Sequence, residues 1–251
     1  EAINDDLLER AERSGLEVLM VTVDVPARGW RPRDMYNGLS LPPRLTAASL
    51  YHAACRPRWS LATLASGIPY FKTMGRYSKD KSLRGMADFI RQELGKPVTR
   101  ERLKHIRRKW KGPLVIKGIM HPVDAEAAVK MGYDGILVSN HGGRQLDACL
   151  SPVEVLADII AQVDGRATIM VDSGFSNGLD IVRGLALGAD FVFCGRAFMW
   201  GVSVLGQKGP EHVINLLSNE LQLALTQIGC PSVNELNKSW LDAKTLSLIH
   251  I

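Results

Sequence analysis

The segment from Ser139 to Asp147 carries residue types that could do chemistry at one turn of the chain. His141 can take or give a proton near neutral pH, and Arg144 presents a planar fork that suits a carboxylate. Gly142 and Gly143 between them let the backbone form a tight turn and come close to a ligand. A base and an anion-binding group in one turn indicate chemistry on a small acid. On this segment alone, a structural histidine beside an ordinary surface turn remains an alternative.

The elements that must position this turn can be predicted from the spacing of apolar residues. Continuously apolar runs predict five strands, at 17–25, 113–119, 135–139, 167–174 and 191–196. Amphipathic segments predict helices at 5–15, 122–132, 151–160, 179–188 and 211–229. Strands that are apolar throughout are typical of a parallel sheet buried on both faces. The alternation predicts an α/β fold, either a (β/α)₈ TIM-barrel type or a doubly wound sheet.

Residues 27–110 interrupt this alternation and are rich in Arg, Pro, Gly and Trp. Their helical periodicity is patchy, so we predict a long loop insertion within a single domain that covers 1–251. Long loops in compact domains are commonly lids or partner surfaces.

Polar residues end every predicted strand. The carboxyl ends of parallel strands meet on one face of the sheet, where α/β proteins build their ligand sites. The residues expected on that face are Thr22, Asp24, Lys117, Ser139, Asp172, Ser173, Gly174, Gly195 and Arg196.

Chemical roles follow from these residue types. Asp24 could orient His141 and stabilise its protonated ring, while Arg31 and Arg144 could bind a substrate carboxylate from two sides. Gly174 and the Gly195–Arg196 pair, each before a predicted helix, offer N–H groups and a cation to a phosphate. Lys117 would lie between phosphate and base, where it could offset negative charge on a cofactor ring.

Composition excludes several classes of protein. The 251 residues carry a net charge of +5, with a basic block at Arg100–Lys111. We interpret this block as a solvated helix face rather than a nucleic-acid surface, because no nucleic-acid module accompanies it. The four cysteines are scattered without a C-x-x-C pair, which argues against a disulfide scaffold and a metal site. We therefore expect reduced thiols in a cytoplasmic protein with no membrane-spanning segment.

Five motifs resemble a known family, the FMN-dependent L-2-hydroxy-acid dehydrogenases and oxidases, which includes L-lactate dehydrogenase, mandelate dehydrogenase and glycolate oxidase. They are Thr-Val-Asp-Val-Pro at 22–26, Val-Ile-Lys-Gly-Ile at 115–119, the segment 139–147, Val-Asp-Ser-Gly-Phe at 171–175 and Gly-Arg-Ala-Phe at 195–198. The resemblance covers nearly the whole chain. Three further segments, at 56–61, 151–156 and 227–231, resemble the lactate and mandelate dehydrogenase branch.

The resemblance implies oxidation of an L-2-hydroxy acid to the 2-oxo acid, with FMN as cofactor. It implies that His141 is the base, that Asp24 is its partner, and that Lys117 stabilises the reduced flavin ring. It assigns the carboxylate to Arg31 and Arg144. The cofactor would contact Thr22, Lys117, Ser139, Asp172, Ser173, Gly174, Ser176, Gly195 and Arg196. The electron acceptor (quinone, cytochrome or oxygen) stays open, and a homotetramer is expected for the full-length form.

The chain also departs from the family pattern. Ser176 stands where an arginine usually contacts the phosphate, which predicts FMN binding weaker by ~1.5–3 kcal/mol. Relatives begin with a lid segment and three further strands, so we expect an incomplete barrel that lacks the N-terminal part and holds the last five strands.

Other interpretations stay open. One is another phosphate-binding (β/α)₈ enzyme in which Lys117 is a Schiff-base nucleophile, and a second is an inactive fragment or interaction module. The insertion could be a peripheral membrane surface at the inner face of the membrane, as in some family members. We favour a lid, because Arg31 belongs to the expected site.

Overall fold

The structure, a computed structural model, describes residues 2–27, 32–38, 46–67, 71–94 and 96–241. Its contacts divide the chain into two compact units. The larger unit comprises Ala2–Asp24 and Val98–Ile251, and the smaller unit comprises Val25–Pro97 together with Glu1. Every described strand lies in the larger unit.

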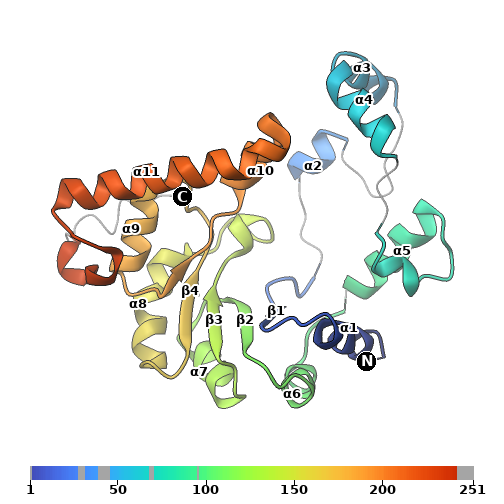
Figure 1. Cartoon of the computed structure of the whole chain (residues 1–251). Coiled ribbons are helices and arrows are strands. Elements are labelled where there is room, and N and C mark those ends of the chain that lie inside the picture. The colour runs from blue at the N-terminus through green and yellow to red at the C-terminus, as the bar shows by residue number, and fades with distance from the viewer. Residues whose placement is uncertain (1, 28–31, 39–45, 68–70, 95, 242–251) are drawn as a thin grey trace. The chain divides into compact units, whose positions relative to one another are not determined.

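The larger unit is built on a five-stranded parallel sheet (Figure 1). Its strands are β1 (Leu19–Thr22), β2 (Leu114–Ile119), β3 (Gly135–Val138), β4 (Thr168–Val171) and β5 (Phe191–Val192). Their order in the sheet is their order in the chain, and all neighbouring pairs are parallel. A doubly wound sheet reverses its strand order at a switch point, whereas a (β/α)₈ barrel does not. The barrel-type prediction is therefore confirmed, and the doubly wound alternative is wrong.

Five helices lie near the predicted places: α1 (Ala2–Arg13), α7 (Pro122–Lys130), α8 (Pro152–Val163), α9 (Gly178–Ala186) and α11 (Gly209–Ile228). Two more, α6 (Arg100–Lys109) before β2 and α10 (Arg196–Leu205) after β5, are not among the predicted helices. Their starts carry local signals. Thr99 caps α6, His121 caps α7 ahead of a proline, and Ser151 forms a capping box with Glu154 at α8. In α11 the left-handed Gly229 ends the helix.

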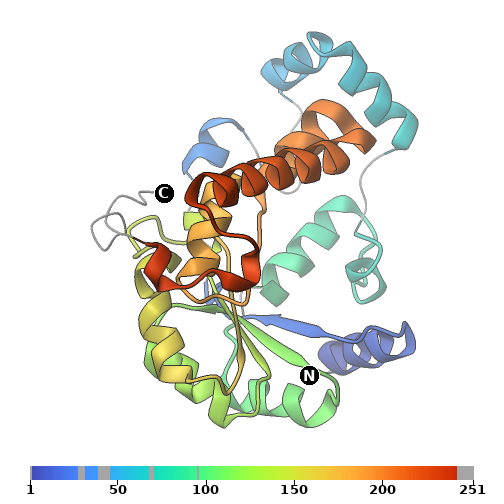
Figure 2. The same cartoon turned by 60° about the vertical axis from the view of Figure 1, so that its left-hand side comes forward.

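The two faces of the sheet pack differently. Ile116, Ile136 and Val171 belong to the main core, which they share with residues of α6, α7 and α8. Figures 1 and 2 show α7 and α8 against this side of the sheet. Alternate strand residues point to the opposite face, where Val115, Leu137 and Met170 pack against one another. Burial on both faces explains why the strand sequences are apolar throughout.

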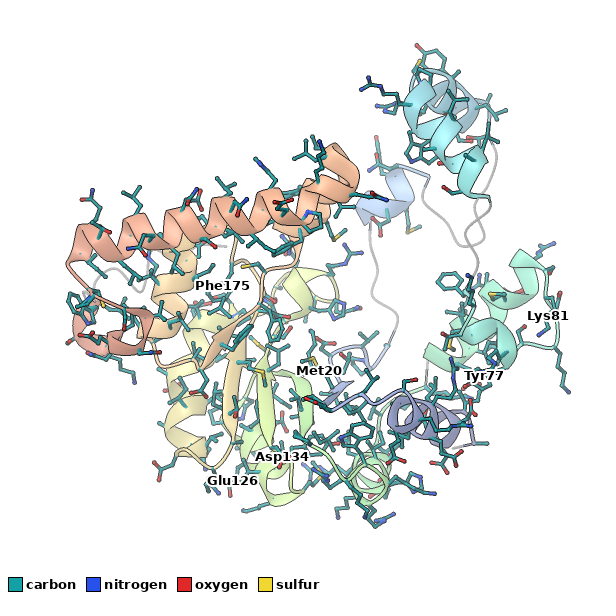
Figure 3. All side chains as sticks on the ribbon, viewed as in Figure 1. Met20, Tyr77, Lys81, Glu126, Asp134 and Phe175 are labelled. Carbon is teal, nitrogen blue, oxygen red and sulfur yellow. The ribbon has the colours of Figure 1, made fainter. Side chains whose placement is uncertain are left out.

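The two ends of the sheet can be followed in Figure 3. Asp134 directly precedes β3 and lies at the end where strands begin, while Phe175 follows β4 at the opposite end. Near the first end, a hollow of about 430 Å³ is lined by residues that include Glu12, Leu16 and Trp110. The polar strand-end residues of the expected site lie at the other end.

The smaller unit contains α2 (Pro32–Tyr36), α3 (Ala47–Ala54), α4 (Pro57–Ser66), a 3₁₀ turn at Met74–Arg76 and α5 (Leu83–Leu94). The predicted insertion 27–110 is thus mostly short helices. It ends earlier than predicted, because Leu103 and Ile106 of α6 lie in the core of the larger unit. In the described residues, no helix is long and apolar enough to cross a membrane.

Candidate active site

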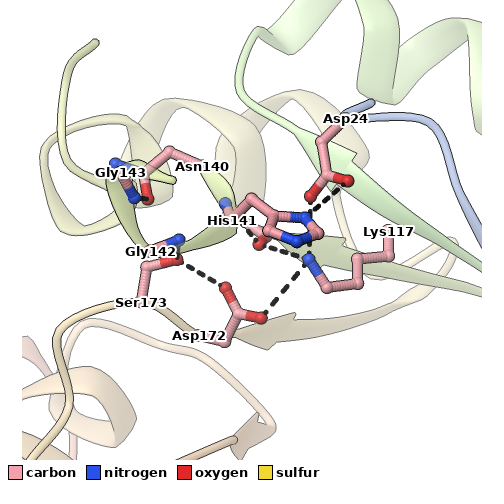
Figure 4. A network of polar contacts seen from close by, with 9 residues as sticks. Asp24, Lys117, Asn140, His141, Gly142, Gly143, Asp172 and Ser173 are labelled. Atoms are coloured by element: carbon pink, nitrogen blue, oxygen red, sulfur yellow. Dashed lines mark hydrogen bonds and ion pairs between the residues drawn. The ribbon is translucent and has the colours of Figure 1, made fainter. Parts of the chain in front are cut away.

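Side chains from four strand ends meet in one polar network in the larger unit (Figure 4). Lys117 Nζ, from β2, donates to Asp24 Oδ2 at 2.8 Å and to Ser139 Oγ at 2.7 Å. It also lies 3.6 Å from Asp172 Oδ2. His141 Nδ1 lies 3.0 Å from Asp24 Oδ1, so Asp24 contacts the histidine and the lysine with different oxygens. The structure therefore brings together residues that are more than 140 positions apart in the chain.

Burial makes this network costly unless its charges are paired. Ser139 is fully buried, and the side chains of Asp24 and Lys117 are only 7% and 17% exposed. A buried carboxylate needs a cation or hydrogen-bond donors to offset its lost hydration. Lys117 provides that cation to Asp24 and Asp172 together. The side chain of His141 is 28% exposed, which leaves the base open to a substrate.

A bulge in β2 directs Lys117 into the network. The register between β2 and β3 shifts between Lys117 and Ile119, and Gly118 between them has φ +102°. A Cβ at Gly118 would lie 2.4 Å from Asp24 Cβ, so only glycine lets the two strands approach here. Sequence reasoning passed over Gly118, although its place directly after the strand lysine was a usable signal.

The turn that carries His141 is left-handed over three successive residues. His141, Gly142 and Gly143 have φ +59°, +67° and +71°. Asn140 accepts a hydrogen bond from the Gly143 N–H at 3.1 Å and donates to the Leu150 carbonyl. Sequence reasoning also missed Asn140, although an asparagine close to a Gly-Gly pair is a signal for a turn held by its side chain.

The amino terminus of α10 is suited to an anion. No described side chain caps this ten-residue helix, and nothing lies within 4 Å of a Cβ built on Gly195. Arg196, the first residue of the helix, donates from Nη2 to the Gly142 carbonyl. Open N–H groups beside an arginine are the chemistry that a phosphate requires.

The amino terminus of α9 differs, because carboxylates and an amide already occupy it. Asn177 accepts from the Asp180 N–H, and Glu220 accepts from the Gly178 N–H at 2.9 Å. Ser176 gives both its N–H and its hydroxyl to Asp180, at 3.0 and 3.2 Å. Both hydrogen-bond donors of Ser176 are therefore directed to the Asp180 carboxylate. Burial, with the nearby charge of Asp180, also raises the pKa of the Cys194 thiol beside this site.

Three other expected residues lie outside the network or outside the described chain. Arg144 is exposed and contributes its backbone N–H to the turn. Thr22 pairs with Lys117 across β1 and β2 but is also exposed. Arg31 lies outside the described residues. In the part of the chain that is described, no group of histidine, cysteine or carboxylate side chains could hold a metal ion.

A barrel-type parallel sheet with an ionisable network at its carboxyl ends, beside a helix terminus suited to an anion, is typical of α/β enzymes that use phosphate-bearing ligands. A model of the FMN-dependent dehydrogenase family matches residues 1–243. The chain therefore belongs to the FMN-dependent dehydrogenase family, whose cofactor is FMN.

The chain is also similar to curated proteins of this family. The chain is 40% identical over 233 residues to an L-lactate dehydrogenase of Pectobacterium atrosepticum, covering 91% of this chain and 60% of the relative. It is 40% identical to an L-lactate dehydrogenase of Allorhizobium ampelinum, covering 92% and 61%. The chain thus spans about 60% of the length of these relatives.

Among solved structures, the monotopic membrane protein (S)-mandelate dehydrogenase is similar with a TM-score of 0.90 at 34% identity. That match covers 96% of this chain and 64% of the other. Mandelate oxidase with (S)-2-phenylpropionate is similar with a TM-score of 0.69 at 34% identity, covering 92% and 56%. The predicted resemblance to this family is confirmed.

Proposed function

We propose that this chain, alone or as part of a longer protein, binds FMN and oxidises an L-2-hydroxy acid of the lactate or mandelate type to the 2-oxo acid. The proposal rests above all on the 3.0 Å contact between His141 Nδ1 and Asp24 Oδ1. This contact supports Nε2, the other nitrogen of the ring, as the base. The family and its named relatives support the reaction class.

The proton transfer follows from the contacts of the ring. With Nδ1–H donated to Asp24, His141 leaves Nε2 unprotonated and able to take a proton from the substrate. Asp24 then faces an imidazolium at one oxygen and the Lys117 ammonium at the other, so it stabilises the protonated base. Arg144, in the same turn, would bind the substrate carboxylate. Arg31, which the family resemblance also assigns to the carboxylate, lies outside the described residues.

The residues present fit FMN. The open end of α10 with Arg196 and Gly195 would hold the phosphate, and Gly174, which also has a positive φ, would lie beside it. Asp172 and Ser173 would contact the ribityl chain. Lys117, Ser139 and Thr22 would lie at the flavin ring. There the ammonium of Lys117 would offset the negative charge that the ring gains on reduction. His141 takes one hydrogen of the substrate as a proton, and bound FMN would accept the other hydrogen with two electrons, as a hydride equivalent.

The other candidate chemistry is Schiff-base catalysis by Lys117. The structure gives one observation against it. The amine of Lys117 is held by Asp24, Ser139 and Asp172 together, whereas a Schiff-base lysine must be free to attack a substrate carbonyl.

The visible absorbance spectrum of the purified chain with FMN tests the proposal. We expect a protein-bound flavin that bleaches on anaerobic addition of L-lactate or L-mandelate. His141→Ala should abolish this bleaching and keep the bound flavin. The imidazole of His141 is the proposed base, and it does not belong to the proposed phosphate site. Reduction that survives in His141→Ala, or bound flavin that neither substrate reduces, would count against the proposal.

We also propose that the smaller unit makes a peripheral membrane contact on the cytoplasmic side. Its helices α3 and α4 expose large apolar side chains, among them Tyr51 at 68%, Leu61 at 66% and Leu64 at 78%. Arg56 and Arg58 lie in the same segment and suit anionic headgroups. The similarity to a monotopic membrane protein supports this contact. A membrane contact is an alternative to the lid role for this segment.

A further inference from the structure

The turn that carries His141 cannot hold its shape by backbone preference alone. The φ of His141, +59°, lies in the left-handed region, where a residue with a Cβ is disfavoured by about 1–2 kcal/mol. Two glycines with φ near +70° follow, and both are free to adopt other conformations. Neighbouring groups must therefore fix the turn if His141 is to keep one position.

Both polar groups of the Gly142 backbone are held by residues from other strand ends. Its N–H donates to Ser173 Oγ at 2.9 Å, and its carbonyl accepts from Arg196. Ser173 follows β4, and Arg196 begins α10. The residue next to the base is therefore fixed from outside its own turn, as Figure 4 shows for Ser173.

The hydroxyl of Ser173 has one arrangement that satisfies all its neighbours. It donates its proton to Asp172 Oδ1 at 2.7 Å, which leaves a lone pair for the Gly142 N–H. Asp172 Oδ2 in turn faces Lys117 Nζ at 3.6 Å. A continuous polar chain thus runs from Lys117 through Asp172 and Ser173 to the turn of His141.

Ser173 is itself held in a strained conformation. Its φ is +73°, a value that glycine would adopt at no steric cost. A serine kept at such a position indicates that its hydroxyl has a use.

We propose that Ser173 is a positioning residue, which fixes the His141 turn through the Gly142 N–H and couples it to the Lys117–Asp172 pair. This inference rests on the proposed function only in taking His141 as the base. It predicts that losing the hydroxyl loosens the turn and slows proton transfer, while FMN and substrate still bind.

Two substitutions separate the hydroxyl from the backbone strain. Ser173→Ala removes Oγ and keeps a Cβ at φ +73°, whereas Ser173→Gly removes Oγ and relieves the strain, so it should fold at least as well. Ser203→Ala is the control for loss of a hydroxyl, because the Ser203 hydroxyl donates to a carbonyl of its own helix, that of Met199. Asp164→Gly is the control for relief of strain, since Asp164 has φ +48° at the end of α8.

Amide hydrogen exchange of the chain without FMN is the first measurement. We expect protection of the Gly142 amide to fall about tenfold or more in both Ser173 variants, and to stay unchanged in both controls. In the chain saturated with FMN, kcat for flavin reduction should fall about 10- to 100-fold, with KM for the hydroxy acid changed less than threefold.

Unchanged Gly142 protection in Ser173→Gly would overturn the inference, as would an equal loss in Asp164→Gly. A rise in KM without a fall in kcat would also overturn it, because it would assign Ser173 to binding. The exchange measurement decides the inference even if the unaltered chain reduces no flavin, an outcome that counts against the proposed function alone.

Discussion

Lys117 is the residue on which the electrostatics of the site depend. It contacts two carboxylates and one hydroxyl from three other segments, and it is mostly buried. With one ammonium and two carboxylates, the network carries a net charge of −1 while His141 is neutral. His141 contacts this network through Asp24 Oδ1 at 3.0 Å, so the base and the lysine share one carboxylate.

Gly118 provides a test of this geometry at the scale of one residue. Gly118→Ala would place a Cβ 2.4 Å from Asp24 Cβ and 2.8 Å from its backbone nitrogen, at φ +102°. We expect a loss of ~3 kcal/mol or more in the free energy of unfolding. Urea unfolding would measure it.

The matched control is Gly165→Ala, which has φ +69° and nothing within 4 Å of the added Cβ. It should lose only ~1–2 kcal/mol, the cost of the left-handed conformation. Equal losses in the two variants would contradict the close approach of β1 and β2 at this site.

Helix ends account for the different chemistry of two neighbouring elements. The end of α9 is filled by Asn177, Glu220 and Asp180, whereas the end of α10 has no described side-chain cap. Both helices follow strands of the same sheet, so the positions of their termini are set by the fold. The capping residues decide which terminus can take an anion.

Ser176→Arg tests this difference. An arginine at 176 could pair with Asp180 and extend a charged donor towards a phosphate at α10. We expect FMN to bind more tightly by ~1.5–3 kcal/mol, roughly 10- to 150-fold in Kd. Isothermal titration with FMN and with riboflavin measures it. A gain for riboflavin equal to that for FMN would contradict a phosphate contact.

The link between α7 and α8 predicts a pH dependence of stability. Hydrogen bonds from Arg166, Gln162 and Lys130 lower the pKa of Glu126 from 4.5 to about 2. A carboxylate with a lowered pKa stabilises the fold above its unfolded pKa, and this stabilisation is lost as the pH falls through the folded pKa. The stability difference between the unaltered chain and Glu126→Gln should be full above about pH 4.5 and vanish near pH 2.

Arg166→Gln serves as the partner variant, because its guanidinium lies 2.6 Å from Glu126 Oε2. It should remove most of the same pH-dependent difference in acid unfolding. A difference that is constant from pH 7 to pH 2 would show that Glu126 acts through packing instead.

At the scale of the whole molecule, the two units differ in what they contain. The network, the α10 terminus and the main core all belong to the larger unit. The smaller unit contributes short helices with exposed apolar side chains. The proposed lid and the proposed membrane contact can be distinguished through these side chains, because only the membrane contact requires them to enter lipid.

Sedimentation with vesicles of phosphatidylcholine and phosphatidylglycerol tests the membrane contact. We expect the chain to pellet with them, and Leu64→Glu to weaken binding about tenfold or more, since burial of one leucine contributes ~1.5–3 kcal/mol. Leu223→Glu on α11, at a leucine that is 60% exposed, is the control and should bind as before. A chain that stays in solution, or an equal effect of both variants, would exclude this contact.

The sequence by itself determined the five strands, most of the helices and the polar residues at the strand ends. Strands and helices follow from short-range periodicity, and the motifs at 22–26, 115–119, 139–147, 171–175 and 195–198 lie at the ends of these elements. The sequence also indicated the family, because those motifs combine rare residue types in a fixed order.

Only the tertiary structure decided between a barrel-type and a doubly wound sheet, because strand order is a property of pairing and not of periodicity. It also decided that α6 packs in the main core, that Asp24 lies close to the backbone of Gly118, and that Ser173 accepts a hydrogen bond from Gly142. These contacts join residues 31 to 94 positions apart. Local sequence patterns cannot specify such pairs, since they depend on how the strands are arranged beside one another.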